Sequence, residues 1–142
     1  EIWITFPDPQ MKKVNKRLTG TRFLSLYSRV AAPGALLNLK TDSPFLYTYT
    51  LAMARLNNLD IIADTDDLYQ ADGLPEELRS IRTFYEQQWL DRGLTIKYLA
   101  FRLPPVGTQL SEPEIEIEHD TYRSFSRGYI QMPDLMDSDN QE

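Results

Sequence analysis

Two aspartates, Asp8 and Asp42, stand where the chemistry of an α/β protein is often found. Each comes just after a short apolar run that predicts a β-strand, 2–6 for Asp8 and 35–39 for Asp42. In open α/β sheets, ligands bind outside the carboxyl ends of the strands, so the two carboxylates could line one crevice. Aspartate is also a common turn residue after strands, and this purely structural interpretation stays open for both.

A stretch with many basic residues and no acid begins immediately after the first predicted strand. Residues 9–41 carry a local charge of +7, whereas the rest of the chain carries −13. The basic residues are Lys12, Lys13, Lys16, Arg17, Arg22, Arg29 and Lys40. A focused positive patch on an acidic molecule favours an anionic partner that docks in one orientation, because the acidic remainder repels it elsewhere. A solvated loop without a partner is the alternative interpretation.

Thr83 and Glu86 have the Thr-x-x-Glu spacing of a capping box. In a capping box the Thr side chain accepts a hydrogen bond from the backbone N–H of the Glu, whose carboxylate reaches back to the N–H of the Thr. A capped helix N-terminus also favours an anionic ligand. The pair could therefore serve the helix alone, or the helix and a site together.

The elements that must position these residues alternate along the chain. Strands are predicted at 2–6, 35–39, 59–63 and 94–103. Helices are predicted over 23–30, from Pro44 with Ser43 as N-cap to Leu56, over 75–81 and over 83–92. This alternation predicts an α/β domain with a mainly parallel sheet.

Apolar side chains at helical spacing predict the faces of the first two helices. The first stripe consists of Phe23, Leu26, Tyr27 and Val30, and the second of Leu46, Tyr49, Met53 and Leu56. Two further aromatic residues, Trp3 and Tyr85, could stack on a nucleobase. We expect both to belong to the hydrophobic core instead.

The carboxyl-terminal part of the chain differs in composition from the rest. From residue 111 onward nine acidic residues face two arginines, which gives a charge of −7. Within it, 114–118 alternates like an edge strand, and 134–142 is predicted to be a frayed tail. We therefore divide the chain into 1–110 and an acidic, partly disordered extension, 111–142.

Composition excludes several classes of protein and site. A chain of 142 residues with 42% hydrophobic residues is one soluble domain, or part of one. The absence of cysteine excludes disulfides and thiolate metal sites, and the single histidine, His119, cannot build a metal site or a Ser-His-Asp triad by itself.

No apolar run approaches the roughly 20 residues of a membrane helix. We expect a cytoplasmic protein without membrane or metal partners. A start at Glu1 that leads straight into a strand suggests a chain cut within a domain.

Several of these motifs, in this order, resemble the tRNA (guanine-N7-)-methyltransferase family, TrmB. The resemblance runs from residue 1 to about residue 103 and rests on Phe6-Pro7-Asp8-Pro9, Lys12-Lys13, Lys16-Arg17, Arg22-Phe23-Leu24, Pro33-Gly34, Lys40-Thr41-Asp42 and Thr83-Phe84-Tyr85-Glu86. It implies the carboxyl-terminal half of a Rossmann-like, class I methyltransferase that uses S-adenosylmethionine. The implied reaction is methylation of N7 of guanine 46 in the variable loop of tRNA.

The resemblance also implies a role for each matching position. Asp8 matches the catalytic aspartate beside both the methyl donor and the guanine, and it is the cofactor-binding residue that this chain retains. The residues implied to bind tRNA or the target base are Lys12, Lys13, Lys16, Arg17, Asp42, Thr83 and Glu86. No metal ligand is implied. The segment 14–19 matches the stretch of the family that contacts tRNA.

The chain departs from the family pattern in three respects. Gln10 stands where the family usually has Trp. The basic loop, which carries Lys12, Lys13, Lys16 and Arg17, is one residue shorter and has Val14 and Asn15 where Arg and His are typical. The glycine-rich turn that holds S-adenosylmethionine has no counterpart, because the six glycines are scattered and form no G-x-G-x-x-G. A non-catalytic RNA-binding module, or one half of a split enzyme, is therefore the alternative to a tRNA methyltransferase. The acidic extension is either a solubilising tail, a surface for another protein, or a segment that folds over the basic loop and mimics RNA.

Overall fold

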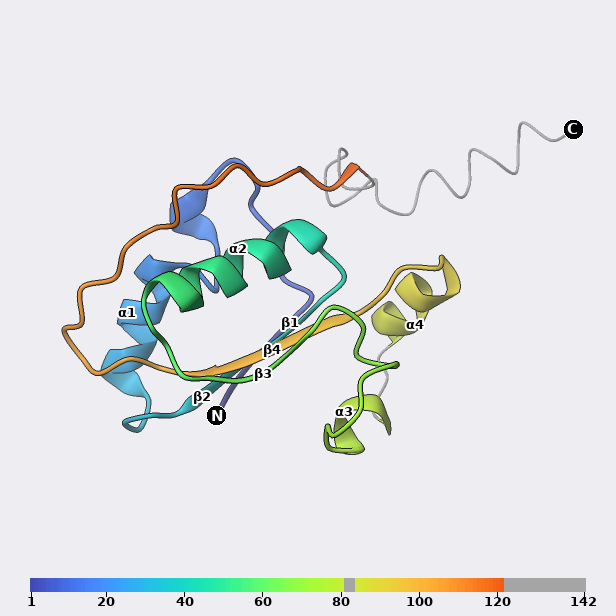
Figure 1. Ribbon diagram of the computed structural model, residues 1–142, viewed down its shortest axis with the longest axis horizontal. Coiled ribbons are helices and arrows are strands. Elements are labelled where there is room, and N and C mark those ends of the chain that lie inside the picture. Colours follow the sequence, from blue (N-terminus) through green and yellow to red (C-terminus); the bar gives the residue numbers. More distant parts are fainter. Residues whose placement is uncertain (81–83, 122–142) are drawn as a thin grey trace, which may run out of the picture.

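The computed structural model describes residues 1–80 and 84–121 as a four-stranded sheet with helices on one face and at one end (Figure 1). The strands are β1 (Ile2–Thr5), β2 (Leu36–Thr41), β3 (Ile61–Thr65) and β4 (Lys97–Arg102), in the spatial order β1-β2-β4-β3. The helices are the 3-10 turn η1 (Val14–Lys16), α1 (Thr21–Val30), α2 (Pro44–Leu56), α3 (Glu77–Ser80) and α4 (Phe84–Asp91). The predicted order of strands and helices is confirmed, with small shifts at their ends.

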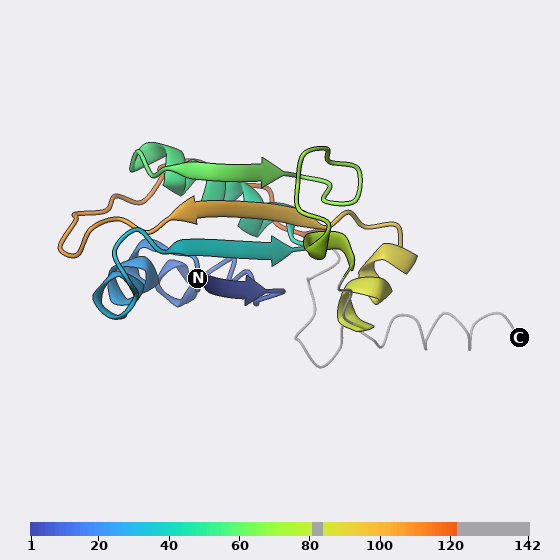
Figure 2. The ribbon, with the colours of Figure 1, turned by 90° about the horizontal axis from the view of Figure 1, so that it is seen from below.

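The sheet is mixed, which corrects the prediction of a mainly parallel one. β1 and β2 pair in parallel, but β4 lies between β2 and β3 and runs antiparallel to both. Figure 2 shows the reason, because α3 and α4 lie beyond the carboxyl ends of β1, β2 and β3. A parallel strand needs a crossover that returns the chain to the opposite edge of the sheet. Without that crossover, β4 starts where its neighbours end.

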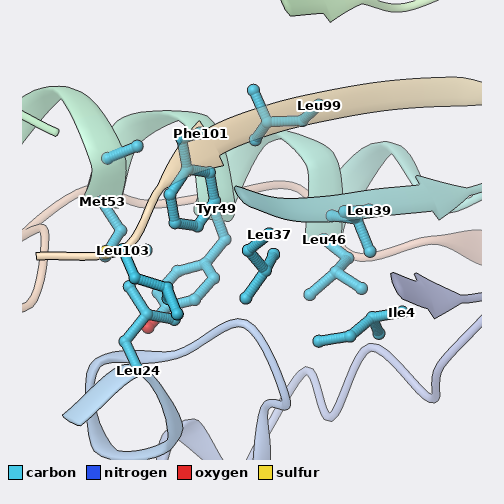
Figure 3. Packing of buried hydrophobic residues seen from close by; sticks show 11 residues of the cluster. Ile4, Leu24, Leu37, Leu39, Leu46, Tyr49, Met53, Leu99, Phe101 and Leu103 are labelled. Carbon is cyan, nitrogen blue, oxygen red and sulfur yellow. The ribbon is translucent and has the colours of Figure 1, made fainter. Parts of the chain in front are cut away.

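The main hydrophobic core lies between the sheet and helices α1 and α2 (Figure 3). Its buried residues are Ile4, Leu24, Leu37, Leu39, Leu46, Tyr49, Met53, Ala54, Leu99, Phe101 and Leu103. Helix α2 begins as predicted: Pro44 is its first residue, and the Ser43 side chain accepts a hydrogen bond from the Leu46 amide at 3.0 Å. This cap fixes the direction in which the chain leaves β2.

Helix α1 buries a different face from the one that its apolar stripe predicts. Leu26 and Val30 of that stripe are 44% and 84% exposed, whereas Leu24 and Ser28 are buried. The sequence contains two overlapping apolar stripes, and Leu24 with the partly buried Tyr27 forms the one that reaches the core. Spacing defines both stripes, but the connections of α1 to its neighbours decide which of them faces the sheet.

The other face of the sheet is only partly covered. A second core contains Leu68, Leu78, Trp89, Ile96, Tyr98 and Ala100, and it joins α3 and α4 to that face. Beside it lies an apolar cavity of about 630 Å³ whose wall includes Trp3. Trp3 is 47% exposed and stacks on Tyr98 with ring centroids 6.3 Å apart, so its prediction as a core residue is wrong. The side chain of Tyr85 lies outside the described part of the chain.

After β4 the chain returns along the outside of α2 (Figure 1). We call residues 110–121 the strap. The predicted edge strand at 114–118 is not formed, because the strap is held by side chains on α1 and α2 and pairs with no strand among the described residues. The predicted tail at 134–142 lies outside the described residues. Over 1–80 and 84–121, no helix is long and apolar enough to cross a membrane.

Candidate active site

The carboxyl edge of the sheet, where β1, β2 and β3 end and β4 begins, brings together most of the predicted site. Thr5 pairs with Lys40 across β1 and β2, and the Phe6 amide donates to the Lys40 carbonyl at 2.8 Å. Because the two strands are parallel and adjacent, Asp8 and Asp42 leave the sheet side by side. Both aspartates therefore follow strands that end at the same edge of the sheet.

Asp8 lies in a turn whose backbone is unusual on both sides. Phe6 and Gln10 have positive φ angles of 51° and 49°, a left-handed conformation that few residues other than glycine adopt. Asp8 Oδ1 accepts a hydrogen bond from the Gln10 amide at 2.9 Å, and the Asp8 side chain is exposed. Such backbone strain is concentrated at functional sites, where it holds a side chain in a set position. The turn presents the Asp8 carboxylate to whatever occupies the edge.

Asp42 follows β2 and, unlike Asp8, is buried to 1% exposure. The Ser43 amide donates to the Thr41 side-chain hydroxyl at 3.0 Å, so a hydrogen bond spans the turn that carries Asp42. Lys97, at the start of β4, pairs with Thr41 in the sheet and lies in the field of Asp42. Burial lowers the pKa of the Lys97 ammonium group, and nearby carboxylates oppose that shift. Lys97 is therefore a buried cation with carboxylates around it at this edge.

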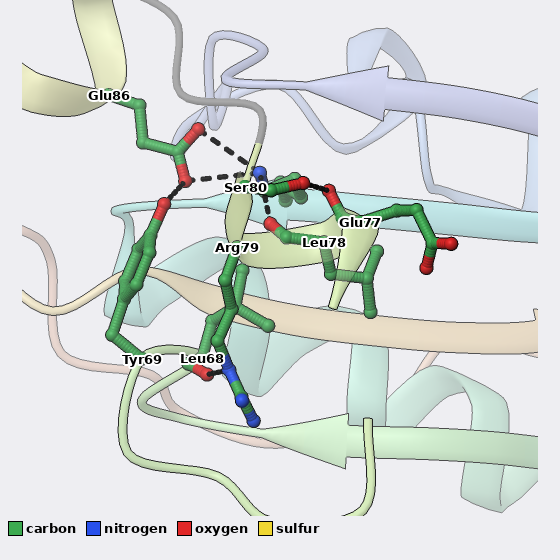
Figure 4. Close-up of polar contacts among 8 residues, drawn as sticks. Leu68, Tyr69, Glu77, Leu78, Arg79, Ser80 and Glu86 are labelled. Carbon is green, nitrogen blue, oxygen red and sulfur yellow. Dashed lines mark hydrogen bonds and ion pairs between the residues drawn. The ribbon is translucent and has the colours of Figure 1, made fainter. Parts of the chain in front are cut away.

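Glu86, on α4, forms a buried ion pair with Lys40 of β2 (Figure 4). The Lys40 ammonium group is 3.0 Å from the carboxylate and also donates to the Leu78 carbonyl at 3.2 Å, and the Tyr69 hydroxyl donates to the same carboxylate. Glu86 is 1% exposed. Glu86 thus neutralises Lys40, one cation of the basic stretch, and joins α4 to β2. Thr83, its predicted partner, lies outside the described residues.

The basic loop contains the turn η1 and carries three exposed cations and one buried cation. Lys12, Lys13 and Lys16 are exposed. Arg17 is 6% exposed, and its guanidinium donates to the carbonyls of Gln10 and Met11, each at 3.1 Å. The guanidinium also lies over the rings of Phe45 and Tyr49, 4.9 Å and 4.4 Å from their centroids. Among the described residues, the three lysines make no such contacts with the loop's backbone, whereas the Arg17 side chain bonds two carbonyls of the loop.

Four residues at the carboxyl edge were not singled out from the sequence. They are Lys97, Asp66, Asp67 and Asp120, and the three carboxylates act on the pKa of Lys97. Asp66 and Asp67 follow β3, so the argument used for Asp8 and Asp42 could have found them. Lys97 depends on the antiparallel insertion of β4, and Asp120 on the path of the strap. No local pattern marks either. The described residues hold no group of three or more His, Cys, Asp or Glu side chains that could bind a metal.

Comparison with known proteins agrees with this geometry. The family model described as "Putative methyltransferase" matches residues 1–99. A protein of Porphyromonas gingivalis named tRNA (guanine-N(7)-)-methyltransferase is 62% identical over 127 residues, which is 89% of this chain and 52% of that protein. A protein of the same name from Bacteroides thetaiotaomicron is 54% identical, and the match covers 89% of this chain and 50% of that protein. Another, from Christiangramia forsetii, is 42% identical, and the match covers 72% of this chain and 47% of that protein. The chain spans about half the length of these relatives.

The mixed sheet, with the carboxyl ends of β1 and β2 side by side, is consistent with part of a Rossmann-like methyltransferase fold. The family match covers all four strands except the last residues of β4. The resemblance that the ordered motifs suggest is therefore confirmed, and the chain belongs to the methyltransferase family that includes the tRNA (guanine-N7-)-methyltransferases, TrmB.

Proposed function

We propose that this chain forms the catalytic and RNA-binding part of an enzyme that transfers a methyl group from S-adenosylmethionine to N7 of guanine 46 in the variable loop of tRNA. One observation carries the proposal. An exposed carboxylate, Asp8, is held in a strained turn at the carboxyl edge, on the same loop as three exposed lysines. Relatives that match most of the chain are named for this reaction.

Methyl transfer to guanine N7 needs no strong base and depends mainly on how the two reactants are positioned. Guanine N7 has an exposed lone pair, so the rate depends on aligning N7 with the methyl carbon and the leaving sulfur. Asp8 can accept hydrogen bonds from the N1–H and N2–H donors of guanine, which turns N7 toward the methyl donor. Its negative charge also stabilises positive charge at the edge.

S-adenosylmethionine, when bound, supplies the methyl group from a positively charged sulfonium. The described residues fit this group in one respect, because the exposed Asp8 carboxylate complements a cation. The chain contains no glycine-rich turn to hold the rest of the cofactor. In this proposal Asp8 is therefore the only residue of the chain that we assign to the methyl donor.

The basic loop would hold the RNA backbone while the base enters the site. The deep major groove of an RNA helix hides N7, so the target guanine must be in a loop or drawn out of its tertiary contacts. Lys12, Lys13 and Lys16 are exposed at and just before η1 and can each bind a phosphate. Arg17 keeps that loop in shape through its bonds to the Gln10 and Met11 carbonyls. The cytoplasm, where we expect the protein, contains the tRNA.

Asp42, Thr83 and Glu86 keep the roles around the target base that the resemblance implies. Asp42 follows β2, next to the strand that leads to Asp8, but it is 1% exposed, so a contact with the base requires the turn to open. Glu86 is held by Lys40 and Tyr69, which supports a part in shaping the pocket. Their contributions can be separated only by comparing binding with turnover.

The test compares the full-length protein that carries this chain with its Asp8→Asn variant on unmodified tRNA. We expect 7-methylguanosine at position 46 with the natural protein, and a loss of about 100-fold or more in kcat for Asp8→Asn with an unchanged melting temperature. Asp60→Asn is the matched control, because Asp60 is also exposed but precedes β3 at the opposite edge. Near-normal turnover of Asp8→Asn would remove Asp8 from catalysis.

A non-catalytic RNA-binding module, or one half of a split enzyme, is the alternative function. The same experiment decides between them. If the natural full-length protein binds tRNA but leaves guanine 46 unmethylated, the proposed activity is wrong and the basic loop serves binding alone.

A further inference from the structure

The strap runs from the end of α2 back to its beginning and is anchored at both ends. Near the end of α2, the Asn57 side chain donates to the Ser111 carbonyl at 2.9 Å and accepts from the Ser111 amide at 2.8 Å. The next residue, Glu112, accepts hydrogen bonds from the hydroxyls of Thr21 and Tyr49, both at 2.6 Å. These contacts join this end of the strap to α1 and α2.

The other end of the strap delivers a carboxylate to the carboxyl edge. Asp120 is 6% exposed, and it accepts hydrogen bonds from the Ser43 hydroxyl and from the Phe45 amide, the latter at 3.0 Å. The first amides of a helix have no partner within the helix. Ser43 bonds the Leu46 amide and Asp120 bonds the Phe45 amide, so the two side chains together complete the start of α2. The negative charge also suits the positive end of the helix dipole.

This anchor lies next to both halves of the candidate active site. Asp42 immediately precedes Ser43, so the turn that carries Asp42 is fixed by Asp120 from one side and by the Thr41 hydroxyl from the other. The Asp120 amide donates to the sulfur of Met11 at 3.2 Å. Met11 belongs to the same loop as Asp8 and is three residues away from it. One residue of the strap therefore touches the turn after β2 and the loop after β1.

We propose that Asp120 is a positioning residue for methyl transfer: it holds the Asp42 turn and the Asp8 loop in a fixed relation to each other. The inference rests on the function proposed above and goes beyond it. Asp120 lies outside residues 1–99, the part of the chain that the family model matches. In this view the acidic strap is a structural part of the active site, and its last described carboxylate supports the edge from outside the sheet.

The experiment uses Asp120→Ala and Asp120→Asn in the full-length protein, with Glu112→Gln as the matched control. Glu112 is a carboxylate of the same strap that also bonds two partners, Thr21 of α1 and Tyr49 of α2, and neither belongs to the Asp42 turn or to the loop that carries Asp8. The readouts are kcat and KM for tRNA, the dissociation constant for tRNA, the melting temperature, and hydrogen exchange of peptides that cover residues 9–17 and 41–47.

For Asp120→Ala we expect kcat to fall about tenfold or more while the dissociation constant for tRNA changes less than about threefold, because misalignment at the reacting centre costs rate more than binding. Exchange should become faster in both peptides. Asp120→Asn keeps an acceptor for the Phe45 amide and should recover part of the rate. Glu112→Gln should lower the melting temperature and leave kcat unchanged below it.

Two results would overturn the inference. One is a wild-type kcat for Asp120→Ala. The other is an equal loss of kcat for Glu112→Gln, which would show that the whole strap stabilises the fold and that Asp120 has no specific positioning role. Failure of the proposed function looks different, because the natural protein itself would then leave guanine 46 unmethylated. In that case the positioning role falls with the reaction that it serves.

Discussion

At the level of single residues, Lys40 shows that a basic side chain can be buried in an ion pair instead of exposed on the surface. It belongs to the basic stretch 9–41, but its side chain is 8% exposed and lies 3.0 Å from Glu86, itself 1% exposed. A buried ion pair contributes little compared with an apolar pair of the same shape, yet removal of one partner leaves an uncompensated charge. Lys40 and Glu86 therefore act as one unit.

Replacing one member or both members of this pair separates its structural role from its catalytic role. We expect Glu86→Gln to lower the free energy of unfolding by about 3 kcal/mol, because the Lys40 charge stays buried with weaker partners. The double variant Lys40→Met with Glu86→Leu should recover much of that loss. Urea unfolding measures both. A fully stable Glu86→Gln would contradict the burial argument.

The activity of the double variant tests whether Glu86 contacts the target base. If Glu86 serves only the fold, the stable double variant should retain most of its kcat. If it also forms part of the pocket, the double variant should be folded and show a raised KM for tRNA. The double variant thus distinguishes a structural role of Glu86 from a direct contact between Glu86 and the substrate.

At the scale of elements, the strap and α2 are joined by the hydrogen bond between Tyr49 and Glu112. Burial raises the pKa of the Tyr49 hydroxyl, and the adjacent Glu112 carboxylate raises it further. A raised pKa means that the folded protein keeps a proton that the unfolded chain loses above about pH 10. The stability from this group is complete below that pH and is lost as the pH rises beyond it.

This proton gives a prediction for stability at alkaline pH. Tyr49→Phe should lower the free energy of unfolding at pH 7 by about 1.5–3 kcal/mol, because Glu112 loses a charge-assisted hydrogen bond. Above about pH 10 the stability of the natural protein should fall more steeply with pH than that of the variant, by at most about 1.4 kcal/mol per pH unit. Denaturant titrations from pH 7 to 11 measure this difference. Parallel curves for the two proteins would show that Tyr49 does not titrate differently on folding.

At the scale of the whole molecule, the charge is divided between a basic loop and an acidic remainder. The net charge is −6, while Lys12, Lys13 and Lys16 stand exposed together on the loop that carries Asp8. The strap glutamates at positions 114, 116 and 118 are also exposed. An anionic RNA is therefore attracted at the loop and repelled by much of the remaining surface.

Salt dependence of tRNA binding measures how many of these lysines meet phosphates. Replacing Lys12, Lys13 and Lys16 by alanine should reduce the slope of the logarithm of affinity against the logarithm of salt concentration by about two, because each phosphate contact releases less than one counterion. Arg102→Ala is the control, because Arg102 is an exposed cation at the opposite edge of the sheet. An equal change of slope in this control would indicate an effect of net charge instead of a binding patch.

Much of this protein could be predicted locally. Apolar spacing, the Ser43-Pro44 start of α2 and the prolines around Asp8 identify the strands and helices within a few residues of their observed ends. The family resemblance follows from short motifs in order, and the family match confirms it. These features depend on neighbours in the sequence, because caps, turns and periodicity act over a few residues.

The sequence by itself therefore determined the family, the order of the elements and the two aspartates that follow strands. Only the tertiary structure decided the antiparallel direction of β4, the buried Lys40–Glu86 pair, the inward position of Arg17 and the arrival of Asp120 at the start of α2. The reason is physical. Burial and pairing of a charge depend on which distant segments the fold brings together, and nothing in local spacing specifies those contacts.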